Sequence, residues 1–184
     1  MSSKPLRADA RRNRARILAA AEEVFAARGA AAATEDVAAA AGVAVGTVFR
    51  HFPTKQDLLS AIVKSLLARL TAEVTALAAD GDPRTALFEF FAGVVAKAAA
   101  NRSVVEALAD GGVHIGVAEP LGGLADALAP LLTGAQAAGT VREDVRLDEV
   151  LALLTATTHG ALHGDWNDDL RDRTLAVVFA GLRT

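Results

Sequence analysis

The sequence predicts an all-α protein of about nine helices, with a small N-terminal helix-turn-helix head followed by a larger helical domain. Three observations predict this class. Ala is the commonest residue and Leu is also frequent, and both favour helices. Apolar residues recur at helical spacing along most of the chain. Gly29, Gly42 and Pro53 fall between the periodic stretches, where helices are expected to end.

Composition excludes several classes of protein. The 184-residue chain has no Cys, which excludes disulfides and thiolate metal sites. No apolar stretch reaches the roughly 18 residues that a membrane-spanning helix needs. Residues 1–16 also lack the apolar segment of a signal peptide. We therefore expect a cytoplasmic protein that has no membrane association.

The charge is unevenly divided along the chain. Residues 1–55 contain nine Lys or Arg and five acidic residues, a net charge of +4, whereas residues 56–184 carry a net charge of −7. A basic end on an acidic body is typical of a protein that binds a polyanion with that end. A solvated basic tail would give the same count, and we expect residues 1–10 to be a disordered basic arm.

The first two helices are expected before residue 42. In residues 11–28, five apolar residues follow the i, i+3, i+4, i+7, i+8 spacing of one buried helix face. Gly29 ends this helix in the left-handed conformation that glycine favours. A second, short helix begins at Thr34, whose hydroxyl can cap it, and ends at Gly42.

A third short helix is expected over residues 45–51. It ends before Pro53, because proline disfavours the α conformation in the residue that precedes it. Thr54 and Asp57 resemble a capping box that opens a long fourth helix, which runs to about Ala79.

These helices together predict a helix-turn-helix, in which two short helices are joined by a tight turn and follow a packing helix. Its small core is expected from Val37, Ala41, Val43, Val48 and Phe52. The third helix would then expose small side chains that allow it to enter the major groove of DNA. A generic helical corner is the alternative.

A specific resemblance lies in two stretches, residues 17–29 and 34–59, which read ILAAAEEVFAARG and TEDVAAAAGVAVGTVFRHFPTKQDLL. They resemble the N-terminal signature of the TetR family of transcriptional regulators. The match covers about the first third of the chain, and its most specific part runs from Gly46 to Lys55. The later stretch GTVREDV, residues 139–145, resembles the segment that many members carry before their dimerisation helices.

The resemblance implies a bacterial DNA-binding transcriptional regulator rather than an enzyme. It implies a repressor that binds a palindromic operator as a homodimer and is released by a small, largely apolar effector. The implied domains are a disordered arm (1–10), a helix-turn-helix DNA-binding domain (11–56) and a helical effector-binding and dimerisation domain (57–184). A constitutive regulator without an effector is an alternative.

The resemblance also implies which residues contact DNA. Thr34 and Lys55 are expected to hold backbone phosphates, Thr47 to face a base, and the arm from Arg7 to Arg16 to reach the backbone or the minor groove. The implied set is Thr34, Ala44, Val45, Gly46, Thr47, Phe49, Arg50, His51 and Lys55.

Two residues depart from the family pattern. Ala44 stands where the family often has Ser, and loss of such a helix cap costs about 1 kcal/mol. Phe49 stands where Tyr is common, so one phosphate hydrogen bond is lost. Both changes are expected to weaken sequence-independent affinity more than specificity.

The rest of the chain continues as helices. A Gly-rich loop is expected over residues 111–123, without the pattern of a phosphate-binding loop. The further helices are expected over residues 83–100, 103–110, 124–138, 147–162 and 170–182.

Two surfaces are expected in the larger domain. An effector pocket would be lined by residues that could equally be ordinary core: Leu66, Leu70, Phe88, Phe91, His114 and Trp166. The last two helices carry apolar stripes that either belong to the core or pair with a second copy in a four-helix bundle. The stripe residues assigned to the dimer interface are Leu151, Leu154, Thr158, Ala161, Leu175, Val178, Phe179 and Leu182.

An enzymatic alternative depends on the C-terminal histidines. His159 and His163 have the i, i+4 spacing of metal ligands on a helix, and Asp165, Asp168 and Asp169 lie nearby. A metal-dependent enzyme is therefore an alternative, although a polar helix end explains the same residues. HExxH, GxSxG and cofactor fingerprints are missing from the sequence, so no metal or cofactor is expected.

Overall fold

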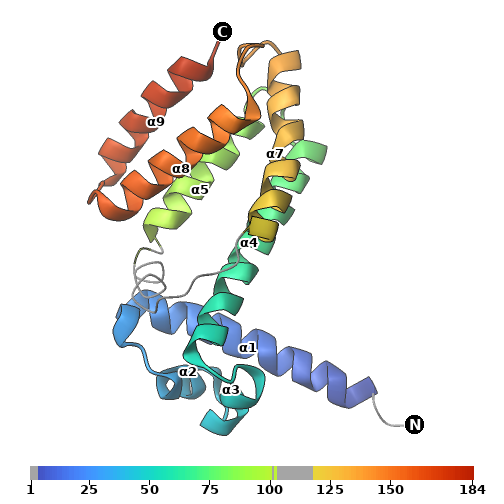
Figure 1. Cartoon of the computed structure of the whole chain (residues 1–184), viewed down its shortest axis with the longest axis vertical. Coiled ribbons are helices and arrows are strands. Elements are labelled where there is room, and N and C mark those ends of the chain that lie inside the picture. Colours follow the sequence, from blue (N-terminus) through green and yellow to red (C-terminus); the bar gives the residue numbers. More distant parts are fainter. Residues whose placement is uncertain (1–3, 101, 103–117) are drawn as a thin grey trace. The chain divides into compact units, whose positions relative to one another are not determined.

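The computed structural model of the chain describes residues 4–100, 102 and 118–184. These residues form eight α-helices and one 3-10 helix, and no strand occurs among them (Figure 1). The predicted all-α class is confirmed. The helix expected over residues 103–110 lies outside the described residues. Within the described ranges, every helix is too short or too polar to span a bilayer.

The described residues form two compact units, residues 4–65 and residues 66–102 with 118–184. The helices of the first unit are α1 (Lys4–Arg28), α2 (Thr34–Ala41), α3 (Val45–His51) and the beginning of α4 (Lys55–Asp80), with a 3-10 helix, η1 (Gly29–Ala31), after α1. Gly29 and Gly42 adopt φ values of 57° and 62°, so both glycines end their helices in the predicted left-handed conformation.

Helix α1 begins earlier than the sequence pattern predicts. It starts at Lys4, so the prediction of a disordered arm is wrong for residues 4–10. Pro5 lies in the first turn of the helix, where a missing backbone N–H costs nothing. Leu, Arg and Ala follow, and all three favour helices.

The caps of α2 and α4 differ. Thr34 is the first residue of α2 and not its cap, which corrects the prediction: Ala33 occupies the cap position. The Asp36 carboxylate accepts a hydrogen bond of 3.2 Å from the Ala33 backbone N–H. At α4, the predicted capping box is confirmed. The Asp57 N–H donates to the Thr54 hydroxyl, and the Thr54 N–H donates to the Asp57 carboxylate, both at 3.0 Å.

The core of the first unit extends beyond the predicted domain boundary. Leu58, Leu59 and Ile62 from α4 are buried together with Phe25 and Val37. This burial explains why the first unit ends at Ser65 and not at residue 56.

The second unit contains the rest of α4 and the helices α5 (Ala86–Ala100), α7 (Ala118–Ala137), α8 (Leu147–His163) and α9 (Asp168–Leu182). Helix α5 packs along α8 and also contacts α7, and α9 lies beside α8 (Figure 1). The core between these helices includes Phe90, Phe91, Val95, Leu128 and Val150.

Two helix starts in the second unit differ from the predictions. Helix α7 begins at Ala118, so the predicted loop is wrong for residues 118–123. Pro120 lies in the first turn of α7, where proline is tolerated. Helix α5 begins at Ala86 after a turn, in which the Ala86 N–H donates to the Asp82 carbonyl at 2.8 Å.

The segment between α7 and α8 is hydrogen-bonded to α7 and to the end of α9. The Gln136 side-chain amide donates to the carbonyls of Arg142 (3.1 Å) and Val145 (2.9 Å). The Arg142 N–H donates to the Leu182 carbonyl at 3.0 Å, at the end of α9. These bonds fix where α8 begins relative to the end of α9.

Candidate nucleic-acid interface

Helix α3 is held by one buried side chain and leaves most of its other side chains accessible. Val48 has an exposed fraction of 0% and belongs to the same core cluster as Val37 and Phe52. Ala44 precedes α3 without a side-chain cap, as its replacement of Ser predicts. The turn around Gly42 is closed by the Val43 N–H, which donates to the Ala38 carbonyl at 3.0 Å.

The predicted DNA-contacting residues all lie in the first unit and differ in exposure. Thr34, Val45, Thr47 and His51 are half-buried. The exposed members of the set are Ala44, Gly46, Phe49, Arg50 and Lys55.

Phe49 is 43% exposed, one of three large apolar side chains that the described residues leave open to solvent. Its neighbour Arg50 and the nearby Gly46 are also exposed. A Cβ atom added at Gly46 would meet no atom within 4 Å, so this part of α3 is open. The outer side of α3 therefore offers an apolar ring, a cation and an unobstructed backbone to a partner.

Arg16 joins α1 to the turn that precedes α3. Its guanidinium donates to the Ala41 carbonyl at 2.9 Å and to the Gly42 carbonyl at 3.4 Å. These carbonyls lie at the C-terminal, negative end of α2, where a cation is stabilising. The family resemblance predicts that Arg16 belongs to the DNA-contacting arm, but its guanidinium donates to carbonyls of the chain itself. No local pattern indicated this contact, because its partners lie 25 and 26 residues away.

Replacing Arg16 with Ala is expected to lower the free energy of unfolding by about 1 kcal/mol. A hydrogen bond to a charged group contributes roughly 1.5–3 kcal/mol, and partial exposure of this one reduces the value. Urea denaturation followed by circular dichroism measures the change. The matched control is Arg12→Ala on the same helix, where an exposed ion pair with Asp9 contributes little. Equal losses in the two variants would show that the Arg16 contact has no special role.

Two other basic side chains of this unit lie over aromatic rings. The Arg14 guanidinium carbon is 4.9 Å from the Phe52 ring centroid, and the Lys55 Nζ is 5.4 Å from the Phe25 ring centroid. Such contacts stabilise a cation at a fixed position. Lys55 is also the first residue of α4, where the helix dipole is positive. A phosphate at this position would interact favourably with both charges.

Asp36 connects α2 to α1. Its carboxylate lies 2.6 Å from the Arg28 guanidinium. The pKa of Asp36 is lowered from its ordinary value, first by the hydrogen bond from the Ala33 N–H and then by the hydrogen bond from Arg28. Because the pKa of Asp36 is lower in the folded protein, its hydrogen bonds and its ion pair with Arg28 stabilise the fold at pH values above the pKa of Asp36 in the unfolded chain. This stabilisation is lost as the pH falls through the lower folded value, so the link persists at neutral pH.

The residues predicted to line an effector pocket are core residues or neighbours of the core. Leu70, Phe88 and Phe91 are buried in the second unit, and Leu66 and Trp166 pack against the same cluster. His114 lies outside the described residues.

The indole of Trp166 packs closely against two glycines, Gly160 and Gly164. A Cβ atom added at Gly160 or at Gly164 would lie 2.7 Å from the indole. No local pattern in the sequence marks these two glycines as the positions that admit the indole.

The predicted dimer interface needs correction. Leu154, Ala161, Leu175 and Leu182 are buried in the core of their own chain, so they are unavailable to a second copy. The remaining predicted residues, Leu151, Thr158, Val178 and Phe179, are half-buried. Of these, Leu151, Val178 and Phe179 pack against the core. The inner stripes of α8 and α9 are therefore mainly core.

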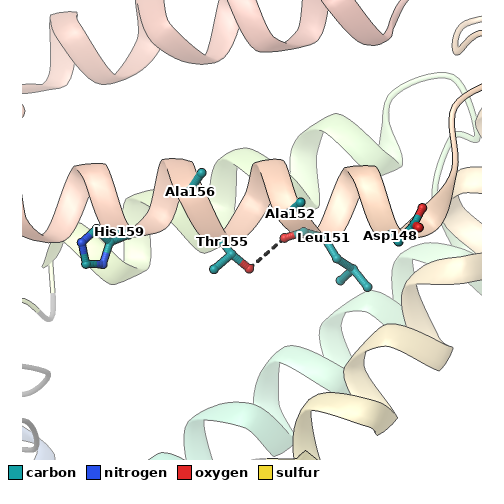
Figure 2. A pocket seen from close by; sticks show the side chains of 6 residues that line it. All are labelled: Asp148, Leu151, Ala152, Thr155, Ala156 and His159. Atoms are coloured by element: carbon teal, nitrogen blue, oxygen red, sulfur yellow. Dashed lines mark hydrogen bonds between the residues drawn. The ribbon is translucent and has the colours of Figure 1, made fainter.

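The opposite sides of these two helices are open. An open groove follows the outer side of α8, where Figure 2 shows its lining side chains on one helix: Asp148, Leu151, Ala152, Thr155, Ala156 and His159. On α9, Leu170 is 46% and Val177 is 74% exposed. We call the exposed residues Ala152, Thr155, Ala156, Leu170 and Val177 the outer α8–α9 face.

The predicted alternative of a metal site that combines histidines with aspartates does not assemble. The described residues contain no group of three or more His, Cys, Asp or Glu that could hold a metal ion. The three aspartates form ion pairs instead, with Asp165 on Arg102, Asp168 on Arg171 and Asp169 on Arg173.

Comparisons with protein families match both parts of the chain. The model described as "Bacterial regulatory proteins, tetR family" matches residues 17–62. The model described as "Transcriptional regulator SbtR-like, C-terminal domain" matches residues 82–184. Comparison with curated protein sequences finds no match.

Several solved structures are similar along nearly the whole chain. A TetR transcription regulatory protein from Mycobacterium vanbaalenii is 40% identical with a TM-score of 0.78, and the match covers 98% of this chain and 100% of that chain. A TetR transcriptional regulator from Streptomyces coelicolor is 31% identical with a TM-score of 0.74, covering 92% and 98%. A third structure, titled "Molecular basis for control of antibiotic production by a bacterial hormones", is 27% identical with a TM-score of 0.73, covering 94% and 98%.

Proposed function

The chain belongs to the TetR family of bacterial regulatory proteins, and we propose that it is a repressor that binds a palindromic operator as a homodimer and is released by a small effector. The observation that carries the DNA-binding part is the open outer side of α3, where Gly46, Phe49 and Arg50 are exposed. Lys55 adds a positive charge at the start of α4.

In the proposed complex, α3 enters the major groove. Gly46 lets the helix backbone approach the base edges, and Thr47 offers a hydroxyl or a methyl group to one base pair. Arg50 and Lys55 bind phosphates, which fixes the register of the helix without reading sequence. Phe49 makes an apolar contact at the groove wall.

The test uses the full chain and the DNA upstream of its own gene, because such regulators often act beside their own genes. Fluorescence anisotropy at several salt concentrations is expected to give sub-micromolar, salt-sensitive binding to a palindrome. This binding should be about 1,000-fold or more tighter than binding to random duplex DNA. Equal affinity for the palindrome and for random duplexes would contradict the proposal.

Three variants are expected to separate phosphate contacts from base contacts. Arg50→Ala and Lys55→Ala should weaken binding to all sequences and lower the salt slope by about 1 each. Thr47→Ala should relax preference at one base pair by about 1–3 kcal/mol. Anisotropy with a set of single-base operator variants measures both effects. The control is Arg84→Ala, an exposed arginine of the second unit, which should leave the affinity unchanged.

The outer α8–α9 face supports the homodimer. A dimer places two copies of α3 in successive major grooves, about 34 Å apart. Small residues such as Ala152 and Ala156 would allow the α8 helices of two copies to approach closely, and exposed Val177 would be covered. A two-fold axis lets the same face meet itself, so one exposed apolar face is sufficient.

The effector part of the proposal depends on linkage. A ligand that binds more tightly to the DNA-free form must weaken DNA binding by the same factor. The apolar character of Leu70, Phe88 and Phe91 favours a small apolar ligand. The similar structure whose title names control by bacterial hormones supports the existence of an effector, without indicating its polarity. A thermal-shift screen with small apolar compounds, followed by anisotropy with each hit, tests this. A screen without hits would favour a constitutive regulator.

A further inference from the structure

His159 and His163 lie one turn apart at the end of α8, and their rings stack. The ring centroids are 4.2 Å apart and the ring planes are inclined by 30°. Both residues are exposed. Two imidazoles at i and i+4 project from the same side of a helix, so both can bind one ion without any change of the backbone.

A backbone hydrogen bond orients one of the two rings. The Nδ1 atom of His163 lies 3.0 Å from the His159 carbonyl oxygen. A carbonyl only accepts hydrogen bonds, so Nδ1 carries the hydrogen, and in the neutral ring Nε2 carries the lone pair. Histidines that bind metals commonly donate their second ring N–H to a carbonyl in this way, which fixes the tautomer and the orientation of the ring.

We propose that His159 and His163 form a two-histidine chelating site for a divalent transition metal of the Zn²⁺, Ni²⁺ and Cu²⁺ class. Imidazole nitrogen suits these ions, and the Zn–N distance is about 2.0–2.1 Å. Both rings are exposed, so an ion can reach them from solvent. His159 lies at the end of the groove of α8, one turn beyond the Ala156 that is proposed to pair in the dimer (Figure 2).

Water completes the coordination shell. The described residues provide no cluster of three or more metal-binding side chains, and the nearby Asp165 carboxylate is paired with Arg102. Two ligands from the protein leave at least two positions of a tetrahedral zinc ion to solvent. The site therefore binds its ion exchangeably and is distinct from a closed structural zinc site.

Isothermal titration calorimetry tests the site on the full chain, prepared without an affinity tag and stripped of metal with a chelator. Titration with Zn²⁺ is expected to show one ion bound per chain at this site. His159→Ala and His163→Ala should each weaken that binding by at least about 10-fold, since losing even a supporting residue of a metal site costs 10–100-fold. Mg²⁺, which prefers oxygen ligands, should show no binding.

A relocated histidine separates chelation from a general effect of histidine content. Adding Ala76→His to the His163→Ala variant keeps the number of histidines, but places the second one on α4 instead of one turn from His159. Zn²⁺ binding should stay as weak as in the His163→Ala variant. Zn²⁺ binding that is unchanged in both single variants, or that the relocated histidine restores, would overturn the proposal. Neither result would affect the proposed operator binding, which is measured without metal.

Discussion

Replacing Val177 with Asp is expected to convert the protein from a dimer to a monomer and to weaken operator binding by at least about 100-fold. Val177 is the most exposed of the large apolar side chains that the described residues leave open. In the proposed dimer this side chain is covered, so the variant buries an uncompensated charge in each copy. Such a charge costs about 3–5 kcal/mol, and each 1.4 kcal/mol is a factor of ten in affinity.

Sedimentation velocity gives the oligomeric state, and anisotropy gives the operator affinity. The matched control is Ala76→Asp, which adds the same charge at an exposed position of α4. Circular dichroism should show that both variants keep their helical content. A Val177→Asp variant that remains dimeric and binds the operator normally would refute the role of the outer α8–α9 face, whereas the DNA-binding role of α3 would still stand.

Replacing Phe91 with Ala is expected to lower the free energy of unfolding by about 3–5 kcal/mol. The Phe91 side chain is 1% exposed and packs edge-on against Phe179, with 5.4 Å between the ring centroids. Phe88 packs against the same ring at 5.0 Å. Truncation removes the buried ring and leaves a cavity that the surrounding helices fill only in part, which is the most costly kind of core substitution.

Urea denaturation of the full chain measures this loss. Glu89→Ala is the matched control, because Glu89 is an exposed residue of the same helix and surface substitutions usually change stability by less than about 0.5 kcal/mol. A loss below about 1 kcal/mol for Phe91→Ala would show that the Phe91 ring is not tightly packed on all sides. That result would favour the prediction that Phe91 lines an effector pocket instead of a fully packed core.

The helix-turn-helix was predictable because its signals are local. Gly42 ends α2 by its left-handed conformation, and the bounds of α3 match the prediction, ending before Pro53. The Thr54 and Asp57 capping box starts α4. Each signal acts within four or five residues of the chain, and local backbone chemistry depends little on the rest of the fold.

Helix starts were predicted less well, above all at α1 and α7. Helices α1 and α7 both contain a proline in their first turn, where proline is compatible with a helix. The cap of α2 was misplaced by one residue, because Thr34 and Asp36 both offer oxygen atoms and only the backbone geometry decides which of them is used.

The sequence by itself determined the helical class, the turn that presents α3 and the family of the protein, because these depend on periodicity and on short motifs. The tertiary structure alone decided which side of α8 and α9 is buried, since both sides carry apolar or small residues at helical spacing. Packing in the core of the second unit buries Leu154 and Leu175 and leaves Thr155 and Val177 open. The tertiary structure likewise placed the Arg16 guanidinium on the carbonyls at the end of α2, a contact between segments far apart in the chain. Periodicity shows that a helix has an apolar side, but only its neighbours determine which side is covered.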